Sequence, residues 1–356
     1  MGKTKLDLDG RTVLVTGSPG FIGANLVMKL LRTMGSGTVV SMDDTNGYYD
    51  PKLKEYRLGL IERAAEGSPV RHVFVKADIA DAEKVSAVFA RYRPSIVVHL
   101  AAQAGVRYSI ENPAAYIASN IGGTFNVLEA CRRYPAEHLV FASSSSVYGA
   151  DAKIPFSTDD KCDSPVSLYA ATKKSCELMA HSYSKLYDVP ATGLRFFTVY
   201  GPAGRPDMFY FSAAEKLISG GKIRIFNHGR CMRDFTFVGD TVEGIMRIMR
   251  LAPKKNKGAD GLPVPPFAVY NIGAGRPTDL MEFARTLHGE MISAGLLPEG
   301  DSLEEHIELV GMQPGDVPVT YADCAEFERV TGFRPQTSVR DGLRAFVGWY
   351  KEYLGK

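Results

Sequence analysis

The stretch "TVLVTGSPGFIG" (residues 12–23) decides the fold. Its first five residues form an apolar, β-branched run that predicts a buried strand, and the glycines that follow predict a tight turn into a helix. A helix that begins directly after such a turn presents free backbone N–H groups, which bind phosphate oxygens. Glycine permits the turn itself, the close approach of the backbone to the phosphates, and the packing of the helix on the strand. The expected contacts of a dinucleotide in this loop are Gly17, Gly20, Phe21, Ile22 and Gly23.

Strands and helices continue to alternate up to about residue 200. Short apolar runs predict buried parallel strands, and the amphipathic stretches between them predict helices. This order is typical of an α/β fold with a doubly wound parallel sheet, helices on both faces and right-handed crossovers. We expect strands at 12–16, 38–43, 72–76, 95–100, 138–143 and 191–197, and helices near 21–32, 52–65, 82–92, 113–133 and 166–187.

Beyond residue 200 the elements become shorter and predict a smaller mixed α/β portion. The expected organisation is a dinucleotide-binding domain over 1–200 and a substrate-binding portion over 201–356, some of whose segments can return to the main sheet. The segment "KKNKGADGLPVPP" (254–266) is basic and then rich in glycine and proline, which predicts an exposed loop. Further helices are expected near 207–219, 240–250, 279–294, 322–331 and 339–354.

The composition excludes several classes of protein. With 42 Lys and Arg against 40 Asp and Glu, the formal charge of +2 is too small to indicate nucleic acid or an anionic membrane as a partner. The five widely spaced cysteines contain no C-x-x-C pair and indicate neither a disulfide framework nor a zinc site, so no metal is expected. The first ten residues lack an apolar signal core, and no apolar run approaches the roughly 20 residues that span a bilayer. We therefore expect a soluble cytoplasmic protein.

Asp43 lies 20 residues after Gly23, at the end of the second expected strand. A carboxylate there accepts hydrogen bonds from the adenosine ribose hydroxyls and repels a 2′-phosphate, which favours NAD over NADP as the cofactor. The alternative is that Asp43 or its neighbour Asp44 caps the turn that follows. The ends of the third and fourth strands supply the further expected cofactor contacts Asp78, Ile79, Leu100, Ala101 and Ala102.

A tyrosine and a lysine stand four residues apart, at Tyr169 and Lys173, within one expected helix. This spacing places both side chains on one helix face, so the ammonium can stabilise a phenolate. Such a tyrosine can act as a general base on a sugar hydroxyl while bound NAD accepts a hydride. The alternative is a tyrosine packed in the helix beside a lysine that faces solvent.

The glycine loop, the serines of "ASSSSVYG" (142–149) and the Tyr169/Lys173 pair together resemble the extended short-chain dehydrogenase/reductase family. The resemblance covers essentially the whole chain and implies a Rossmann-type sheet. Longer strings resemble the UDP-glucuronate 4-epimerases, and they are more specific than the glycine loop. They are "HLAAQAGVRYS" (99–109), "SLYAATKK" (167–174), "LRFFTVYGPAGRPDM" (194–208), "FNHGRCMRDFTF" (226–237) and "QPGDVPVTYAD" (313–323).

The resemblance implies roles for the residues that match the family's motifs. Tyr169 is then the general base, Lys173 holds the nicotinamide ribose beside it, and Ser144 hydrogen-bonds O4 of the sugar. It also implies a homodimer formed through helices 113–133 and 166–187. Gln313 stands where related galactose epimerases place an arginine, so no phosphate contact is implied for it. The matching substrate positions are Thr198 near the sugar ring, Arg205, Arg233 and Asp316 around the uridine diphosphate, and Arg107 as a further candidate.

The two residues after Ser144 indicate which reaction follows oxidation of the sugar. Dehydratases of this superfamily carry Asp-Glu directly after that position and decarboxylases carry Glu two positions after it, whereas this chain has Ser145 and Ser146. The resemblance therefore implies interconversion of UDP-glucuronate and UDP-galacturonate with tightly bound NAD, and we expect both serines to contact the UDP-hexuronic acid. The alternatives are a UDP-glucose or UDP-N-acetylhexosamine 4-epimerase, or a non-catalytic dinucleotide-sensing protein on the same fold.

Overall fold

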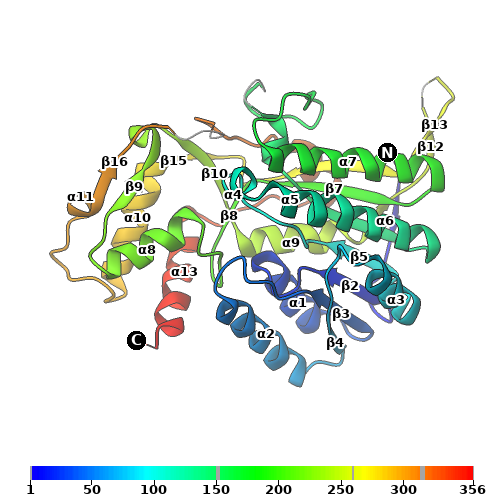
Figure 1. The fold of residues 1–356 in the computed structure, drawn as a ribbon, viewed down its shortest axis with the longest axis horizontal. Coiled ribbons are helices and arrows are strands. Elements are labelled where there is room, and N and C mark those ends of the chain that lie inside the picture. Colours follow the sequence, from blue (N-terminus) through cyan, green and yellow to red (C-terminus); the bar gives the residue numbers. More distant parts are fainter. Residues whose placement is uncertain (1, 150–152, 259, 313–316, 356) are drawn as a thin grey trace. The chain divides into compact units, whose positions relative to one another are not determined.

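The computed structural model describes residues 2–149, 153–258, 260–312 and 317–355, and its chain divides into two compact units (Figure 1). The first unit consists of Met1–Ala152, Thr158–Phe196 and Val242–Asn271. The second consists of Lys153–Ser157, Phe197–Thr241 and Ile272–Lys356. The chain passes between the units at Phe196 and Phe197, among other places, and segment 242–271 belongs with the first unit.

A seven-stranded sheet forms the centre of the first unit, in the order β14-β7-β6-β5-β2-β3-β4. The neighbouring strands from β7 to β4 are paired in parallel, so the doubly wound parallel sheet predicted from the sequence is confirmed. The strands are β2 (Thr12–Thr16), β3 (Thr38–Asp43), β4 (Arg71–Lys76), β5 (Ile96–His99), β6 (His138–Ser144), β7 (Ala191–Phe196) and β14 (Phe267–Ile272).

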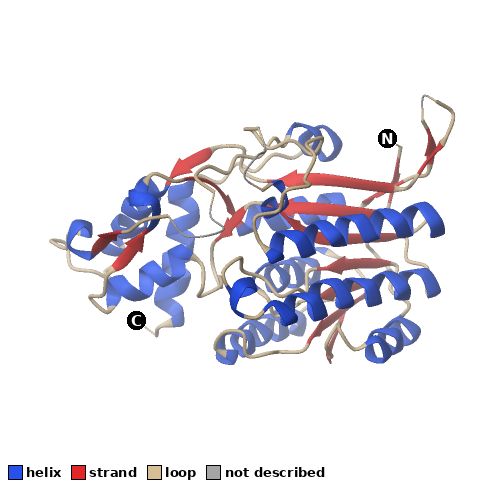
Figure 2. Cartoon of the chain, turned by 45° about the horizontal axis from the view of Figure 1, so that its top comes forward, coloured by secondary structure: helices blue, strands red, loops and turns tan. Residues whose placement is uncertain are grey.

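Both faces of this sheet are buried, as the continuous apolar strands require. Leu14, Val97 and Phe141 pack in one cluster with residues of α3, α6 and α7. Val13 and Val15, which flank Leu14 and point to the opposite face, are also fully buried. Figure 2 shows helices on both sides of these strands. The helices are α1 (Phe21–Thr33), α2 (Pro51–Glu66), α3 (Ala82–Tyr92), α4 (Tyr108–Glu111), α5 (Pro113–Tyr116), α6 (Thr124–Arg133) and α7 (Leu168–Tyr187).

The region expected to be one helix over 113–133 is interrupted. Between α5 and α6 the chain forms a π-helical segment, Ile117–Gly123, whose wider turns carry Asn120 inward. The Asn120 side chain donates to the carbonyl of Gln103 and to the Thr172 hydroxyl, and it accepts from the Gln103 N–H. The buried Asn120 amide thus makes three hydrogen bonds where the helix departs from α-helical geometry. No local sequence pattern predicts this departure.

The segment 254–266 is mostly exposed among its described residues, as expected, but it is not wholly irregular. Its described residues include the antiparallel strands β12 (Asn256–Lys257) and β13 (Pro263–Val264). A second small ladder pairs β1 (Lys3–Lys5) with β11 (Leu251–Pro253), just after α9 (Val238–Ile248). Hydrogen bonds between short strands therefore give regular structure to part of a segment whose composition predicts a loop.

The second unit is a mixed α/β structure built around short strands. Its largest sheet has the order β15-β10-β8, from β8 (Thr198–Tyr200), β10 (Met232–Phe237) and β15 (Pro277–Asp279), and β9 (Ile223–Ile225) pairs with β16 (Ile307–Leu309). Stacked Phe235 and Phe283, with ring centroids 3.8 Å apart, lie in its aromatic core beside Tyr200. The helices are α8 (Phe209–Ile218), α10 (Leu280–Ser293), α11 (Leu303–His306), α12 (Ala325–Thr331) and α13 (Val339–Tyr353).

One buried carboxylate, Asp234 on β10, ties three segments of the second unit together. It accepts backbone hydrogen bonds from Ala274 (2.7 Å), Gly275 (3.0 Å) and Ala322 (3.1 Å). Gly273 must lack a side chain here, because an added Cβ would lie 2.9 Å from a carboxylate oxygen of Asp234 and 2.6 Å from the Cβ of Ala322. These bonds satisfy three peptide N–H groups that lie outside the named strands.

Candidate functional site

The glycine loop between β2 and α1 is folded tightly against the end of β5. Gly17 has φ +73°, and an added Cβ would lie 2.6 Å from the backbone nitrogen of Ala101. The N–H of Gly20 donates to the Gly17 carbonyl at 3.0 Å, and Gly20 is the N-cap of α1. A Cβ on Gly23 would lie 2.1 Å from the Gly17 carbonyl oxygen, so this close approach of helix and turn requires glycine.

Two buried polar atoms, one in this loop and one in the chain that follows β5, have no hydrogen-bond partner among the described residues. They are the hydroxyl of Ser18 and the amide nitrogen of Gln103. Buried polar groups are nearly always paired, so unpaired groups beside an open helix N-terminus fit a polar ligand such as the phosphates of a dinucleotide. The glycine cradle, the helix start and these two groups together fit NAD.

Asp43 ends β3 as a buried carboxylate and caps the turn that follows, which is the alternative that the sequence raised for it. Its Oδ1 accepts from the N–H of Thr45 at 2.7 Å, so it caps the following turn. The same oxygen lies 3.4 Å from the ammonium of Lys54, which is itself buried. Burial raises the pKa of Asp43, while the nearby Lys54 opposes that rise. Asp44 caps the same turn through the N–H of Asn46.

Two cations on α2 thus face the dinucleotide end, and the sequence analysis did not identify either. Besides Lys54, the fully buried Arg57 donates to the carbonyl of Pro19 in the glycine loop at 3.2 Å. Both lie against the ring of Tyr49. Lys54 and Arg57 stand three residues apart in an expected helix, a spacing that places both on one face. Sequence reasoning could have used this spacing to identify them.

The other residues expected to contact the cofactor also have contacts within the protein. Asp78 is exposed and accepts from the N–H of Ala80, whereas Ile79 is buried against Gly123 of the π-helical segment. Leu100 donates its N–H to the Thr16 carbonyl, and Ala101 donates to the Thr16 hydroxyl. The remaining loop residues Phe21 and Ile22 start α1, and Ala102 follows β5 as a partly exposed residue.

Tyr169 and Lys173 lie on one face of α7, as predicted. The ammonium of Lys173 is buried and donates to the Ala142 carbonyl on β6 at 3.0 Å. Tyr169 is partly exposed, with its ring edge-on to Tyr116 and the centroids 6.1 Å apart. The alternative of a solvent-facing lysine is therefore wrong for this chain.

The serine stretch ends β6 and turns into a short 3-10 helix, Ser145–Tyr148. Ser143 donates to a carboxylate oxygen of Glu177 at 2.6 Å. Ser144 accepts from the N–H of Ser146 at 3.2 Å and lies 3.1 Å from its hydroxyl. Ser145 and Ser146 are partly exposed. Ser144, Tyr169 and Lys173 thus come from adjoining parts of β6 and α7 beside the end of the sheet where the glycine loop lies.

The substrate candidates divide between the two units. Arg107 precedes α4 in the first unit and is exposed. In the second unit, Thr198 starts β8, Arg205 forms two hydrogen bonds to Asp207, and Arg233 donates to the carbonyls of Met232 and Pro318, each at 3.0 Å. Asp316 and Gln313 lie outside the described residues.

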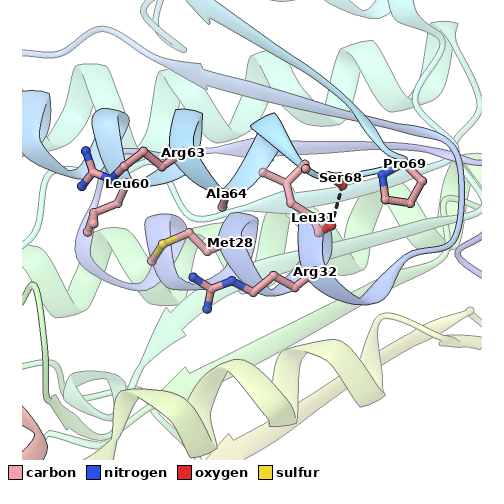
Figure 3. A pocket seen from close by; sticks show the side chains of 9 residues that line it. Met28, Leu31, Arg32, Leu60, Arg63, Ala64, Ser68 and Pro69 are labelled. Atoms are coloured by element: carbon pink, nitrogen blue, oxygen red, sulfur yellow. Dashed lines mark hydrogen bonds between the residues drawn. The ribbon is translucent and has the colours of Figure 1, made fainter.

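A separate groove of about 500 Å³ lies between α1 and α2 (Figure 3). It is lined by the exposed Arg32 and Arg63 and by apolar residues such as Met28 and Leu60. None of the expected cofactor or substrate residues lines this groove, so it forms no part of the candidate site.

No group of three or more His, Cys, Asp or Glu that could hold a metal occurs among the described residues. Within that same part of the chain, no helix is long and apolar enough to cross a membrane. The groups gathered at the sheet are instead a phenol, a hydroxyl and a buried ammonium beside a dinucleotide cradle. Such a set can remove and return the proton of a hydroxyl whose carbon loses and regains a hydride.

Comparison with known proteins agrees with this geometry. A model of the "NAD dependent epimerase/dehydratase family" matches residues 13–273. "Protein CapI" of Staphylococcus aureus is 46% identical over 350 residues, covering 97% of this chain and 99% of the relative. A "Probable UDP-glucuronate 4-epimerase" of Rhizobium meliloti is 42% identical over 349 residues, covering 95% and 96%. UDP-glucuronic acid 4-epimerase from Bacillus cereus, solved with UDP-glucuronic acid and NAD, gives a TM-score of 0.81 at 29% identity, covering 96% and 99%.

Substitution of Gly23 tests the glycine cradle. In Gly23→Ala the new methyl group forces the Gly17 carbonyl to move, so we expect loss of bound NAD and a decrease of about 1–3 kcal/mol in the free energy of unfolding. The matched control is Gly59→Ala in α2, where the nearest atom to an added Cβ is Arg63 Nη1 at 3.6 Å. The measurements are the NAD content of the purified protein, calorimetric titration with NAD after the bound cofactor is removed, and chemical unfolding. Wild-type NAD affinity in Gly23→Ala would contradict the assignment.

Proposed function

Because the chain belongs to the NAD-dependent epimerase/dehydratase family, we propose that it interconverts UDP-glucuronate and UDP-galacturonate by inverting C4 of the sugar. The observation that carries the proposal is the set of Ser144, at the end of β6, with Tyr169 and Lys173 on the adjoining α7. Ser144 is followed by two serines instead of carboxylates. Relatives at 42% identity named as UDP-glucuronate 4-epimerases support this choice of substrate.

The proposed reaction begins with proton removal at O4 of the sugar. The phenolate of Tyr169 accepts that proton, and the hydroxyl of Ser144 donates a hydrogen bond to the same oxygen. Lys173, whose buried ammonium belongs to the same helix face, would hold the nicotinamide ribose beside Tyr169. NAD, when held by the glycine cradle and Asp43, supplies a hydride acceptor at C4 and returns the hydride.

The second half of the proposed reaction returns the proton on the other face of the sugar. The 4-keto sugar first rotates so that its opposite face receives the hydride. Tyr169 then gives the proton back to O4 as the hydride returns to C4, so no net proton or electron is consumed. Ser145 and Ser146 bring no carboxylate to C5 or C6, which leaves inversion as the outcome. We assign Thr198 to the sugar and Arg205, Arg233 and Asp316 to the uridine diphosphate, because a guanidinium fork suits phosphate oxygens.

The proposal is tested by incubating purified protein, without added NAD, separately with UDP-glucuronate and UDP-glucose. We expect UDP-galacturonate from the first substrate and little UDP-galactose from the second. Tyr169→Phe should keep its NAD and lose about 10²–10⁴-fold in kcat, because the general base is missing. Preferred conversion of UDP-glucose would favour the alternative hexose epimerase, and no conversion of either substrate would favour a dinucleotide-sensing protein.

A second test concerns the carboxylate of the sugar. The 4-keto intermediate is a β-keto acid, which loses CO₂ when its carboxylate turns perpendicular to the ketone plane. We propose that Ser145, Ser146 and Thr198 hold the carboxylate out of that orientation. A Ser145→Ala/Ser146→Ala variant should then raise the ratio of UDP-pentose to epimer at least about threefold.

Total turnover in that variant falls as well, because the Ser146 hydroxyl also contacts Ser144. The ratio of products, measured by chromatography and compared with the unsubstituted enzyme, is therefore the informative quantity. An unchanged ratio would show that the serines do not restrain the carboxylate.

We also propose that the protein is a cytoplasmic homodimer. Its five cysteines are all free, as a reducing compartment requires. Exposed apolar side chains lie on both helices that the family resemblance assigns to the interface, including Phe125 on α6 and Leu178 and Leu186 on α7. A second copy of these helices would cover them.

Sedimentation velocity tests the dimer. Leu178→Glu/Leu186→Glu should convert a dimer into a monomer, because two carboxylates per copy would be buried without partners. Leu262→Glu, which changes an equally exposed leucine beside β13, should leave the dimer intact. A monomeric unsubstituted protein would refute the proposal.

A further inference from the structure

A buried ion pair lies directly behind the serine stretch, in the first unit. Nε and Nη2 of Arg195, on β7, donate to the two carboxylate oxygens of Glu177, on α7, each at 2.8 Å. Both side chains are almost fully buried, with 3% and 4% of their surfaces exposed. The parallel two-bond geometry is the strongest form of a carboxylate and guanidinium contact.

This pair contacts both sides of the turn that carries the reactive hydroxyl. Ser143, directly before Ser144, donates to Glu177 at 2.6 Å. The guanidinium of Arg195 lies over the ring of Tyr148, 4.7 Å from its centroid, and the Tyr148 hydroxyl donates to Asn271 at 2.6 Å. Glu177 and Arg195 therefore hold the turn 144–148 at its start and at its end.

The same pair extends the line of contacts by which α7 lies on β6. Tyr169, Lys173 and Glu177 follow one another at intervals of four residues and share one helix face. Lys173 donates to the carbonyl of Ala142, and Glu177 accepts from the next residue, Ser143. Two successive residues of β6 are thus bonded to two successive turns of α7. These bonds fix the position of the helix along the strand, and the second of them lies directly before Ser144.

Stability alone does not account for an ion pair at this position. Removing two charges from water costs several kcal/mol, and an apolar pair of similar volume is often at least as stable. Burial is the largest single influence on the pKa of Glu177 and raises it, but the hydrogen bonds and charge of Arg195, the hydrogen bond from Ser143 and the charge of Lys174 together lower it. The carboxylate is therefore kept ionised, with its oxygens fixed in the direction of Ser143.

We propose that Glu177 and Arg195 are positioning residues for the epimerase reaction, which act through Ser143 to set the separation of the Ser144 hydroxyl and the Tyr169 phenol. Those two groups must meet the same sugar oxygen although they stand on different elements. A shift of α7 along β6 separates them without removing either. The proposal rests on the proposed function, because it assigns a role in that reaction.

Ser143→Ala is the informative substitution, because it removes the bond between strand and carboxylate and leaves the ion pair in place. We expect kcat for UDP-glucuronate to fall about tenfold, with KM changed less than about twofold and the NAD content unchanged. Ser143→Thr restores a hydroxyl and should recover most of the lost kcat. Glu177→Gln should show the same loss of kcat together with a lower melting temperature.

The matched control is Ser41→Ala. Ser41 is also a buried serine on a strand of the same sheet, and its hydroxyl bonds a side chain of the neighbouring strand, His72, at 2.9 Å. If the role of Ser143 is merely structural, Ser143→Ala and Ser41→Ala will both have a lower melting temperature and will have the same kcat. That result would overturn the proposal. Failure of Ser143→Thr to recover kcat would also overturn it. Inactivity of the unsubstituted protein would refute the proposed function instead, so the two failures are distinguishable.

Discussion

The hydrogen bond from Lys173 to the Ala142 carbonyl is the contact on which the site depends. A buried ammonium must be paired, and the backbone of β6 supplies its acceptor. This requirement holds α7 against the end of the sheet, where the serine stretch and the glycine loop also lie. Nearby, burial first and the charge of Lys173 second lower the pKa of His99 to about 3, so this histidine stays neutral between Thr16 and Thr124. Lys173 itself lies four residues after Tyr169 on the same helix.

The four serines of residues 143–146 show how neighbouring hydroxyls acquire different partners. Alternation along β6 turns Ser143 toward α7 and Glu177, whereas Ser144 lies at the start of the 3-10 turn and contacts Ser146. In the second unit, the Asp234 carboxylate accepts three backbone hydrogen bonds from two segments, one at Ala274 and Gly275 and the other at Ala322. In both units, a buried carboxylate thus accepts hydrogen bonds from chain at or just beyond the end of a strand.

Much of the first unit could be predicted from local patterns. The strand before Gly17 and the strand that ends at Asp43 have the bounds expected from their apolar runs, because buried parallel strands are mostly apolar on both faces. The Tyr169/Lys173 pair also follows from helical spacing. Asn120 could not be found in this way, because its contacts arise from a π-helical turn and a partner loop far along the chain. Arg195 carried a weaker signal: an arginine within a buried strand needs a carboxylate, but only the packing of α7 shows that the carboxylate is Glu177.

The central claim is that Ser144, Tyr169 and Lys173 move a proton at O4 while the hydride of C4 leaves and returns within one closed site. The most direct measurement follows the label in UDP-glucuronate that carries deuterium at C4, during turnover in ordinary water. The account predicts that the UDP-galacturonate formed retains the deuterium at C4, because the hydride never exchanges with solvent. Replacement of that deuterium by hydrogen from water would contradict it.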